Sequence, residues 1–438
     1  MSLSDKEFLQ VLSEMESWSN YEITAKPRDL SKLDGIRLLL KDLGSPHKKF
    51  KIIHIAGTNG KGFTATIISS LLCGQGFDTG CYTSPHLTDI RERITINNQF
   101  ISKSTFTQSA SLVLKFARGY RGSPYLSYFD ILTAIAFHAF MTEKMEWVVL
   151  ETGLGGLADS TNVTAKKLCV LTRVGLDHQE ALGNSLREIA AEKIGITIPG
   201  VPIIVGDQPP ELIPWLAERF GKLKVPYYFV DEIFDRYYPN NQLSSESFSK
   251  PRMACIKTSL CAMDVLFNGK ISDKQKWVEI TKHVKIRGRL ELRRNVFWRK
   301  HGKLINTILF DGGHNSDALT ALVDFISVNK LFPCTLILGM AADKLKPTLR
   351  IPLKDLCEKA ENLIFTTMSS PRSATAESLE IFIKKCAKFQ HSPKILHSSS
   401  VEESLKNAIL AVDKPVVVAG SFYLVGEVIQ ILENGSTT

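Results

Sequence analysis

The chain has 438 residues, and 54 Lys and Arg residues against 45 Asp and Glu residues give it a formal net charge of +9. At about 150 residues per domain, this length predicts two or three domains, each able to bury a core. The hydrophobic share of 44% and the charged share of 23% are ordinary globular values, which exclude wholesale disorder, a collagen-like repeat and a disulfide scaffold. The basic surplus suits nucleic acid, an anionic membrane or phosphorylated small molecules, and charge alone does not choose among them.

The sequence favours a cytoplasmic location. Its eight cysteines are scattered without a C-x-x-C pair, and no His lies at zinc-ligand spacing, which is typical of reduced, mostly buried thiols. The first residues, MSLSDKEFLQ, lack the basic start and apolar core of a secretory signal, and early acids argue against a mitochondrial presequence. No apolar run approaches the length that crosses a bilayer, so we expect no membrane partner.

Short β-branched runs alternate with stretches of helical period, as in a parallel sheet with crossover helices. In chain order we expect a helix at 33–43, a strand at 51–55, a helix at 61–73, a strand at 78–82, a helix at 131–140, and strands at 147–150, 168–171 and 202–205. Residues 237–251 are rich in Asn, Ser and Pro, and this composition predicts an exposed loop.

The same alternation resumes after that loop. The expected strands are 306–310, 334–338, 362–365, 394–396 and 415–418, with helices at 316–326 and 377–386. We therefore predict an α/β fold in two domains. A P-loop, doubly wound, mostly parallel sheet domain would span residues 1–285, and a smaller Rossmann-like α/β domain would span residues 286–438.

The strand at 51–55 runs into the segment AGTNGKG and then into a helix, which is the context that a phosphate-binding loop requires. Glycines let backbone N–H groups close on phosphates, the helix N-terminus adds its dipole, and Lys61 can reach the β- and γ-phosphates. The spacing G-x-x-G-K is shorter than the common G-x-x-x-x-G-K-[ST], and a tight structural turn at Gly57 and Gly60 is the alternative. The position of Lys61 favours phosphate binding.

Three further polar clusters directly follow predicted strands. Glu151 begins ETGLGG, His178 lies in GLDH, and Ser84 lies in YTSPHL. Ligands of doubly wound sheets bind beyond the carboxyl ends of the strands, so these side chains would lie near the phosphate loop. A carboxylate there suits Mg²⁺, which takes one or two carboxylates plus phosphate oxygens. The alternatives are a surface acid before a turn for Glu151 and a structural histidine for His178.

Eight motifs now stand in order along nearly the whole chain: AGTNGKG, TSPHL, ETGLGG-x-x-D-x-TN, LDH, EKIGI, GRLE, DGGHN and GSFYLVGE. Together they resemble the folylpolyglutamate synthase/dihydrofolate synthase family. This family is a branch of the Mur-type amide ligases, which join a carboxylate to an amino acid with ATP. Cell-wall Mur ligases place a nucleotide-sugar domain before the phosphate loop, and only 56 residues precede Gly57 here, which disfavours that branch.

The resemblance implies a set of site residues. The residues that match ATP contacts in the family are Gly57, Thr58, Asn59, Gly60, Lys61, Gly62, Phe63, Arg289, Asp311 and His314. Those that match Mg²⁺ ligands are Ser84, Glu151 and His178. Those that match contacts to the pterin-bearing substrate are Ser127, Tyr128, Phe129, Asp130, Ala158, Asp159 and Ser160. The implied catalytic residues are Lys61, His178 and Lys193.

The resemblance also implies a reaction. The substrate carboxylate would attack the γ-phosphoryl group of ATP while Lys61 and Mg²⁺ spread the developing charge, and L-glutamate would then displace phosphate from the acyl phosphate. The lysine that matches Lys193 is carbamylated in many relatives, and an ordinary solvated helix lysine is the alternative. The expected partners are small molecules, namely ATP, dihydropteroate or a folate, and L-glutamate, with no nucleic acid and a monomeric chain.

Three departures from the family pattern are evident. Phe63 stands where the family has Ser or Thr, Leu157 replaces an Arg, and Arg287 replaces a Pro. Three hypotheses therefore stay open. They are a dihydrofolate synthase, a folylpolyglutamate synthase or bifunctional enzyme, and a non-catalytic nucleotide- or pterin-binding relative, which Phe63 suggests.

Asp130 favours the first hypothesis. In the segment SYFD it stands where bacterial-type enzymes that use dihydropteroate carry an acid, whereas eukaryotic polyglutamate synthases resemble Tyr-Phe-Arg there. The GLGG form of the segment after Glu151 and the lack of a presequence point the same way. Capping of the following helix is the alternative role for Asp130.

Overall fold

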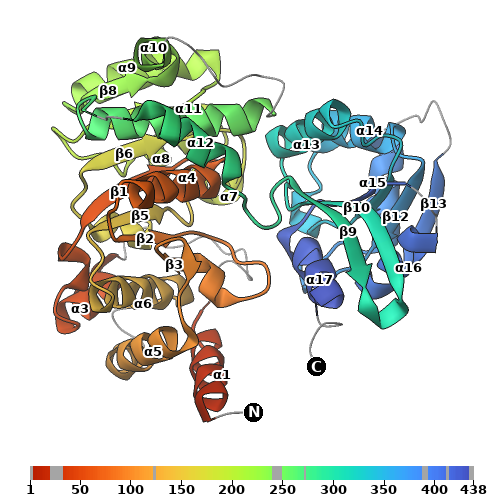
Figure 1. The fold of residues 1–438 in the computed structure, drawn as a ribbon, viewed down its shortest axis with the longest axis horizontal. Coiled ribbons are helices and arrows are strands. Elements are labelled where there is room, and N and C mark those ends of the chain that lie inside the picture. The colour runs from red at the N-terminus through yellow and green to blue at the C-terminus, as the bar shows by residue number, and fades with distance from the viewer. Residues whose placement is uncertain are drawn as a thin grey trace. The chain divides into compact units, whose positions relative to one another are not determined.

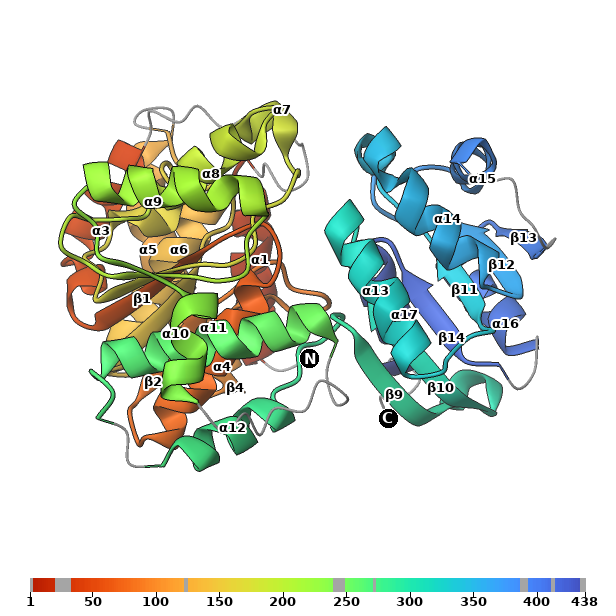
Figure 2. The same cartoon turned by 90° about the horizontal axis from the view of Figure 1, so that it is seen from above.

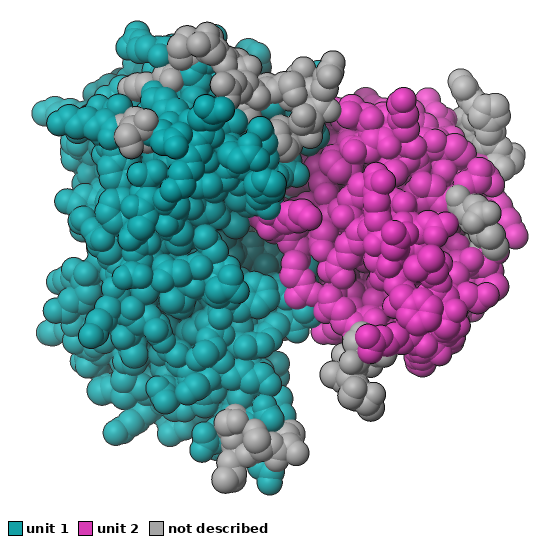
Figure 3. Space-filling view, viewed as in Figure 1, with its two compact units in different colours: residues 1–284 teal, residues 285–438 magenta. Residues whose placement is uncertain are grey.

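The computed structural model describes residues 3–19, 33–121, 125–238, 249–270, 273–386, 393–410 and 414–433. The chain divides into two compact units, residues 1–284 and residues 285–438 (Figure 3). Each unit is a sheet flanked by helices, which confirms the α/β class that the sequence predicts. Within the described part of the chain, no helix combines the length and the hydropathy needed to cross a membrane.

The sheet of unit 1 has the strand order β4-β3-β2-β5-β1-β6-β7-β8. Its strands are β1 (Lys51–Ala56), β2 (Thr79–Tyr82), β3 (Ile94–Ile96), β4 (Gln99–Phe100), β5 (Trp147–Glu151), β6 (Leu168–Leu171), β7 (Ile203–Val205) and β8 (Tyr227–Phe229). Strand β1 pairs in parallel with β5 on one side and β6 on the other. The chain leaves β1 toward β2 and later returns to β6, so the end of β1 lies at the switch point where such sheets bind ligands.

The helices of unit 1 cover both faces of this sheet (Figures 1 and 2). They are α1 (Leu3–Glu16), α3 (Leu33–Asp42), α4 (Lys61–Gly74), α5 (Lys103–Ala117), α6 (Tyr128–Thr142), α7 (Gln179–Leu182), α8 (Leu186–Ile194), α9 (Ile213–Lys222), α10 (Val230–Tyr237), α11 (Lys250–Leu266) and α12 (Lys274–His283). Helices α4, α11 and α12 pack on one face, and α1, α3, α5 and α6 pack on the other.

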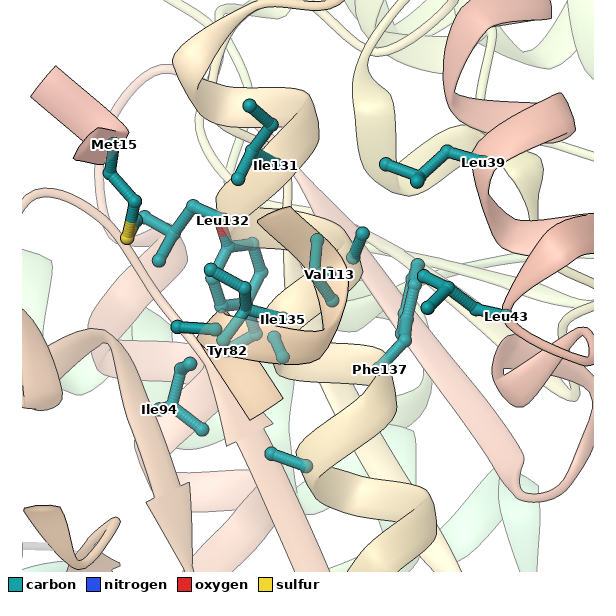
Figure 4. Close-up of a cluster of buried hydrophobic side chains, with 14 of the residues drawn as sticks. Met15, Leu39, Leu43, Tyr82, Ile94, Val113, Ile131, Leu132, Ile135 and Phe137 are labelled. Atoms are coloured by element: carbon teal, nitrogen blue, oxygen red, sulfur yellow. The ribbon is translucent and has the colours of Figure 1, made fainter. Parts of the chain in front are cut away.

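Strand alternation divides the isoleucine side chains of β1 between two cores. Ile52 belongs to the core under α5 and α6, whereas Ile53 and Ile55 belong to the core under α4 and α11. Figure 4 shows part of the first core, where Tyr82 of β2 lies beside Leu132 and Ile135 of α6. Each fully buried isoleucine contributes about 1.5–3 kcal/mol, so β1 is held firmly from both sides.

The loop prediction for residues 237–251 is wrong at both ends. Tyr237 is the last residue of α10, and α11 already begins at Lys250, with Pro251 in its first turn. Proline is favourable there because the first helical N–H groups have no partner within the helix. Residues 239–248, the middle of the predicted loop, lie outside the described residues.

Unit 2 contains a six-stranded sheet of order β13-β12-β11-β14-β10-β9. Its strands are β9 (Glu291–Trp298), β10 (Lys303–Asp311), β11 (Thr335–Leu338), β12 (Asn362–Thr366), β13 (Lys394–Ser398) and β14 (Val416–Ala419). Its helices are α13 (Ser316–Val328), α14 (Arg350–Glu358), α15 (Ala376–Cys386), α16 (Val401–Leu410) and α17 (Phe422–Glu433). All strand pairs are parallel except β9 with β10.

Candidate active site

The phosphate loop lies between β1 and α4 and depends on its glycines. Gly57 has a φ of +152°, and a Cβ atom there would lie 1.9 Å from Oγ1 of Thr172. Gly60 is the N-cap of α4 with a φ of +87°, and a Cβ atom there would lie 2.7 Å from Sγ of Cys255. Only glycine combines these backbone angles with such close approach. The loop is therefore packed against the end of β6 and against α11.

Thr58 joins the phosphate loop to the segment that contains His178. The backbone N–H groups of Thr58 and Asn59 both donate to the carbonyl oxygen of Arg173, at 2.8 and 3.2 Å. The Thr58 hydroxyl donates to the carbonyl oxygen of Gly175 at 3.1 Å and accepts from its N–H at 3.0 Å. These bonds hold the start of the GLDH segment beside the loop.

Glu151 lies at the centre of the predicted site and is only 2% exposed. Its Oε2 accepts a hydrogen bond of 2.9 Å from the backbone N–H of Ser84, and its Oε1 lies 3.9 Å from Nζ of Lys61. A Cβ atom at Gly62 would lie 3.1 Å from Oε2, so glycine lets the first turn of α4 approach the carboxylate. The structure thus brings together Ser84, Glu151 and Lys61, and it places Glu151 in the interior rather than on the surface.

These donors fit a magnesium ion. The Glu151 carboxylate and the Ser84 hydroxyl are hard oxygen ligands beside a phosphate loop, and Mg²⁺ commonly takes one or two protein ligands together with water and phosphate oxygens. His178 is exposed at the N-cap of α7 with a φ of 49°, and its Nε2 lies 4.0 Å from Oδ2 of Asp177. Among the described residues, no group of three or more His, Cys, Asp or Glu side chains is arranged to hold a metal ion.

Lys193 is a buried residue of α8 and not a solvated helix lysine. Its side chain is 4% exposed, and Nζ donates a hydrogen bond of 2.8 Å to the carbonyl oxygen of Gly57. Burial, and secondly the charge of Lys61, lower the pKa of Lys193 to about 7, although Asp177, Asp159 and Glu192 oppose the shift. A substantial fraction of this amine is therefore uncharged near neutral pH.

Asp130 connects the two segments that match substrate contacts. Its Oδ2 accepts hydrogen bonds from the backbone N–H of Ser127 at 2.9 Å and from the Ser127 hydroxyl at 2.6 Å, which forms a capping box at the start of α6. Its Oδ1 accepts from the Ser160 hydroxyl at 2.6 Å. Both oxygens thus have protein donors, and Asp130 has the capping role that the sequence left open.

Most of the predicted substrate contacts have buried side chains. These are Ser127, Tyr128, Asp130, Ala158, Asp159 and Ser160. Phe129 is only half-buried, and its ring lies 5.8 Å from the ring of Tyr82. A Cβ atom at Gly153 would lie 2.5 Å from Cζ of Phe129, so this ring covers the loop that follows Glu151. Phe129 is therefore the aromatic ring of this group that keeps some exposed surface.

In unit 2, Asp311 joins two segments that match nucleotide contacts. It ends β10, and its carboxylate accepts hydrogen bonds from the N–H groups of Leu290 and Gly313, both at 2.9 Å. Burial raises the pKa of Asp311 to about 6, against the opposing effects of these two hydrogen bonds and of Arg289. The segments GRLE and DGGHN thus meet at one carboxylate.

Phe422, which the sequence reasoning did not single out, is the platform for these segments. The guanidinium carbon of Arg289 lies 4.6 Å from the centre of its ring, and the ring of His314 lies 6.2 Å away in a T-shaped arrangement. A Cβ atom at Gly312 would lie 2.4 Å from the ring. The available signal was the motif GSFYLVGE, which follows β14, the neighbour of β10.

Phe63 is half-buried and packs against the core from the first turn of α4. It contacts the cluster under α4 and α11, and the guanidinium carbon of Arg252 lies 5.3 Å from the centre of its ring. Arg252 in turn donates to the carbonyl oxygen of Val284 at 3.0 Å. The other two departures lie on the surface, where Leu157 is 53% exposed and Arg287 pairs with Glu433 at 3.0 Å.

Comparison with known proteins shows a match to a domain family and matches to whole proteins. Residues 296–431 match the family described as "Dihydrofolate synthetase, C-terminal domain". Most of the chain resembles the dihydrofolate synthetase of Saccharomyces cerevisiae, with 30% identity over 430 residues that cover 91% of this chain and 97% of the yeast protein.

Solved structures show the same fold at lower identity. Mycobacterium tuberculosis folylpolyglutamate synthase complexed with ADP superposes with a TM-score of 0.82 at 22% identity, over 98% of this chain and 99% of the other. Yersinia pestis bifunctional folylpolyglutamate synthase/dihydrofolate synthase complexed with AMPPNP and Mn ion gives 0.77 at 24% identity, over 97% of this chain and 98% of the other.

A phosphate loop with a buried acid beside it, followed by a Rossmann-like unit, is the architecture of an ATP-dependent ligase, and its relatives are enzymes of this class. The protein is accordingly an acid–amino-acid ligase that forms an amide bond and releases ADP. The chain belongs to the folylpolyglutamate synthase/dihydrofolate synthase family. The family resemblance that the eight sequence motifs predict is therefore confirmed.

Proposed function

We propose that the protein is a dihydrofolate synthase, which joins L-glutamate to 7,8-dihydropteroate through an acyl phosphate and yields 7,8-dihydrofolate, ADP and phosphate. The observation that carries this choice is the likeness to the yeast dihydrofolate synthetase along nearly its whole length, supported by the matching C-terminal domain family. Asp130 no longer contributes to the choice, because its hydrogen bonds account for its presence.

In the first step the phosphate loop and Lys61 would bind the ATP phosphates. The loop backbone and the N-terminus of α4 offer N–H donors, and Lys61 supplies a positive charge close to Glu151. The carboxylate of the acid substrate would attack the γ-phosphorus, so that the bond between the γ-phosphorus and the bridging oxygen breaks and ADP leaves. Lys61 would stabilise the charge that accumulates on the transferred phosphoryl oxygens.

Glu151 and Ser84 are the residues that we propose to hold Mg²⁺, with His178 as a third ligand. A bound Mg²⁺ would neutralise charge on the phosphate oxygens and orient them. Glu151 is suited to this role because its carboxylate is buried and already fixed by the N–H of Ser84. In unit 2 the proposed nucleotide contacts are Arg289, Asp311 and His314.

Lys193 is the residue that we propose to be carbamylated. Its uncharged amine would add to carbon dioxide, forming an N–C bond and releasing one proton, and the product would be a carboxylate. The lowered pKa of Lys193 supports this reaction because only the neutral amine is nucleophilic. Carbon-13 NMR of protein equilibrated with labelled carbon dioxide tests it. A carbamate resonance that disappears in Lys193→Arg supports the modification, and a spectrum without one in the wild type contradicts it.

In the second step the amine of L-glutamate would attack the acyl carbon, and phosphate would leave as the amide bond forms. The half-buried ring of Phe129 and the segment of Ala158, Asp159 and Ser160 are the proposed contacts of the pterin-bearing acid. A flat pterin can stack on an aromatic ring, with a contribution of about 0.5–1.5 kcal/mol beyond its buried area.

A two-substrate assay tests the proposed function. Purified protein is incubated with ATP, Mg²⁺ and L-glutamate, together with either dihydropteroate or tetrahydrofolate, and both ADP and the glutamylated product are measured. We expect turnover with dihydropteroate and none with tetrahydrofolate. Turnover with tetrahydrofolate alone would overturn the proposal.

A bifunctional enzyme is the second candidate. The Yersinia pestis protein of the same fold is described as bifunctional, which supports keeping this possibility in the same assay. Turnover with both acids would replace the first proposal with this one. Product masses then distinguish a single added glutamate from a chain of several.

A further inference from the structure

His54 lies in the middle of β1 and is fully buried, three residues before Gly57. By strand alternation it lies on the same face as Ile52. Its Nε2 is 2.7 Å from the hydroxyl oxygen of Thr161, a residue 107 positions further along the chain. The Thr161 hydroxyl in turn lies 2.5 Å from Oδ1 of Asp159. A buried hydrogen-bonded chain therefore runs from the strand of the phosphate loop to a segment that matches substrate contacts.

The direction of these hydrogen bonds follows from the number of protons. Thr161 has one hydroxyl proton, which it donates to the Asp159 carboxylate, so its oxygen accepts from the N–H at Nε2 of His54. Burial holds the pKa of His54 well below its usual range, which keeps the imidazole neutral with its single proton on Nε2. His54 is thus a fixed donor, and Nδ1 has no hydrogen-bond partner in the described structure.

Asp159 passes this connection to the residues around it. Its Oδ1 also accepts from the backbone N–H of Thr161 at 3.0 Å, and its Oδ2 accepts from the N–H of Leu154 at 3.0 Å. We call residues 154–162 the substrate loop. At its far end the Asn162 amide donates to the carbonyl oxygens of Leu157, at 2.9 Å, and Gly195, at 3.1 Å. The contacts with His54 and with the end of α8 are therefore made by adjacent residues, Thr161 and Asn162, at the C-terminal end of the loop, and Asp159 connects this end to Leu154 at its start.

We propose that His54 is a positioning residue for the acid substrate, because it sets the substrate loop at a constant distance from the phosphate loop. The identity of that substrate rests on the proposed function. Three residues of extended strand, roughly 10 Å, separate His54 from Gly57, and both faces of β1 are packed in cores. In this proposal the rigid strand β1 sets both binding positions. ATP would bind at the phosphate loop that follows the strand, and the acid would bind at the substrate loop that His54 holds.

Two matched pairs of variants test this proposal. His54→Leu removes the donor, whereas His54→Gln keeps an N–H group near the position of Nε2. Thr161→Val removes the hydroxyl with little change of shape, whereas Thr161→Ser keeps it. If His54→Leu does not fold, Thr161→Val and Thr161→Ser are sufficient for the test.

The first measurement needs no substrate. Amide hydrogen exchange is followed in peptides that cover residues 154–162, with peptides of β1 and α4 as the reference within the same protein. Loss of one buried hydrogen bond should speed exchange in the substrate loop by roughly tenfold in Leu and Val variants, and the Gln and Ser variants should stay near wild type. Equal exchange in all variants would overturn the proposal, whichever acid the enzyme uses.

The second measurement separates positioning from general damage. With whichever acid supports turnover, His54→Leu and Thr161→Val should raise the KM for that acid roughly tenfold and change the KM for ATP less than twofold. His54→Gln should restore most of the loss. An equal rise of both KM values, or a fall of kcat with neither KM changed, would contradict a positioning role. If only the dihydropteroate assay fails, the proposed acid substrate is wrong, but the hydrogen-exchange test of His54 remains valid.

Discussion

The amine of Lys193 donates a hydrogen bond of 2.8 Å to the carbonyl oxygen of Gly57. This bond joins α8 to the first residue of the phosphate loop, across 136 positions of sequence. The N–H group of Leu157 adds a second connection, because it donates to the carbonyl oxygen of Glu192 at 2.9 Å. Helix α8 is therefore in direct contact with both the phosphate loop and the substrate loop.

Lys193 should reduce stability in a way that depends on pH. The pKa of Lys193 is about 7 in the folded protein and has its usual value of 10.5 in the unfolded chain. Between these pH values the unfolded chain binds one more proton than the folded protein. The free energy of unfolding of the wild type should consequently rise with pH in this window, by up to about 1.4 kcal/mol per pH unit, relative to Lys193→Met. Urea denaturation at pH 7.0 and 9.0 measures the difference, and parallel pH profiles of the two proteins would contradict it.

Glu151→Gln should remove metal-dependent turnover while the fold is kept. Glutamine can still accept the N–H of Ser84, but it loses the charge that a divalent cation requires. We expect the rate of ADP formation to fall by at least about a hundredfold at all Mg²⁺ concentrations. Glu146→Gln is the matched control, since that acid is 44% exposed and pairs with Lys51 on the surface. Near-normal activity of the Glu151 variant would remove this residue from the mechanism.

Phe63→Ser restores the hydroxyl of the family pattern and should still be harmful. The half-buried ring packs against the core and against Arg252, so its loss should lower the free energy of unfolding by about 2 kcal/mol. Because Glu151 and Ser84 are the proposed metal ligands, the Mg²⁺ concentration that gives half-maximal activity should not change. A lower Mg²⁺ requirement in the variant would show that the missing hydroxyl matters, and thermal denaturation checks the stability.

Asp311 should make nucleotide affinity depend on pH near 6. Its pKa is raised to about 6, so the carboxylate becomes ionised as the pH rises through that value. An ionised acceptor forms stronger hydrogen bonds with nucleotide hydroxyls, and the affinity for ADP should therefore increase from pH 5 to pH 7. In Asp311→Asn the affinity should be lower and flat over this range. Calorimetric titrations at three pH values test it, and identical slopes for both proteins would exclude Asp311 as the titrating group.

The sequence was most informative where short-range rules apply. Strand β6 has the predicted bounds, and Glu151 lies beside Ile55 in register because parallel neighbours end at the same edge of a sheet. Strand β9 was missed, since a half-buried edge strand with several charges lacks the apolar run of a central strand.

Contacts between distant segments could not be predicted. The pairs His54 with Thr161 and Phe63 with Arg252 depend on how helices and loops pack over the sheet, which a single sequence does not specify. The motif positions of the candidate site were therefore accessible from sequence, whereas the residues that hold them in place were not. Asp130 is an example: its position was recognised from a motif, but its hydrogen bond with Ser160, which lies in another motif, was not predicted.

The place of β14 affects how unit 2 can be made in the cell. This strand comes last in the sequence of the sheet, yet it lies between β11 and β10 near the middle. Until residues 416–419 have been synthesised, no strand joins β10 to β11, and each of them leaves one edge with unpaired backbone N–H and C=O groups. In unit 1 the last strand, β8, is an edge strand, so no strand made after it has to enter the middle of that sheet.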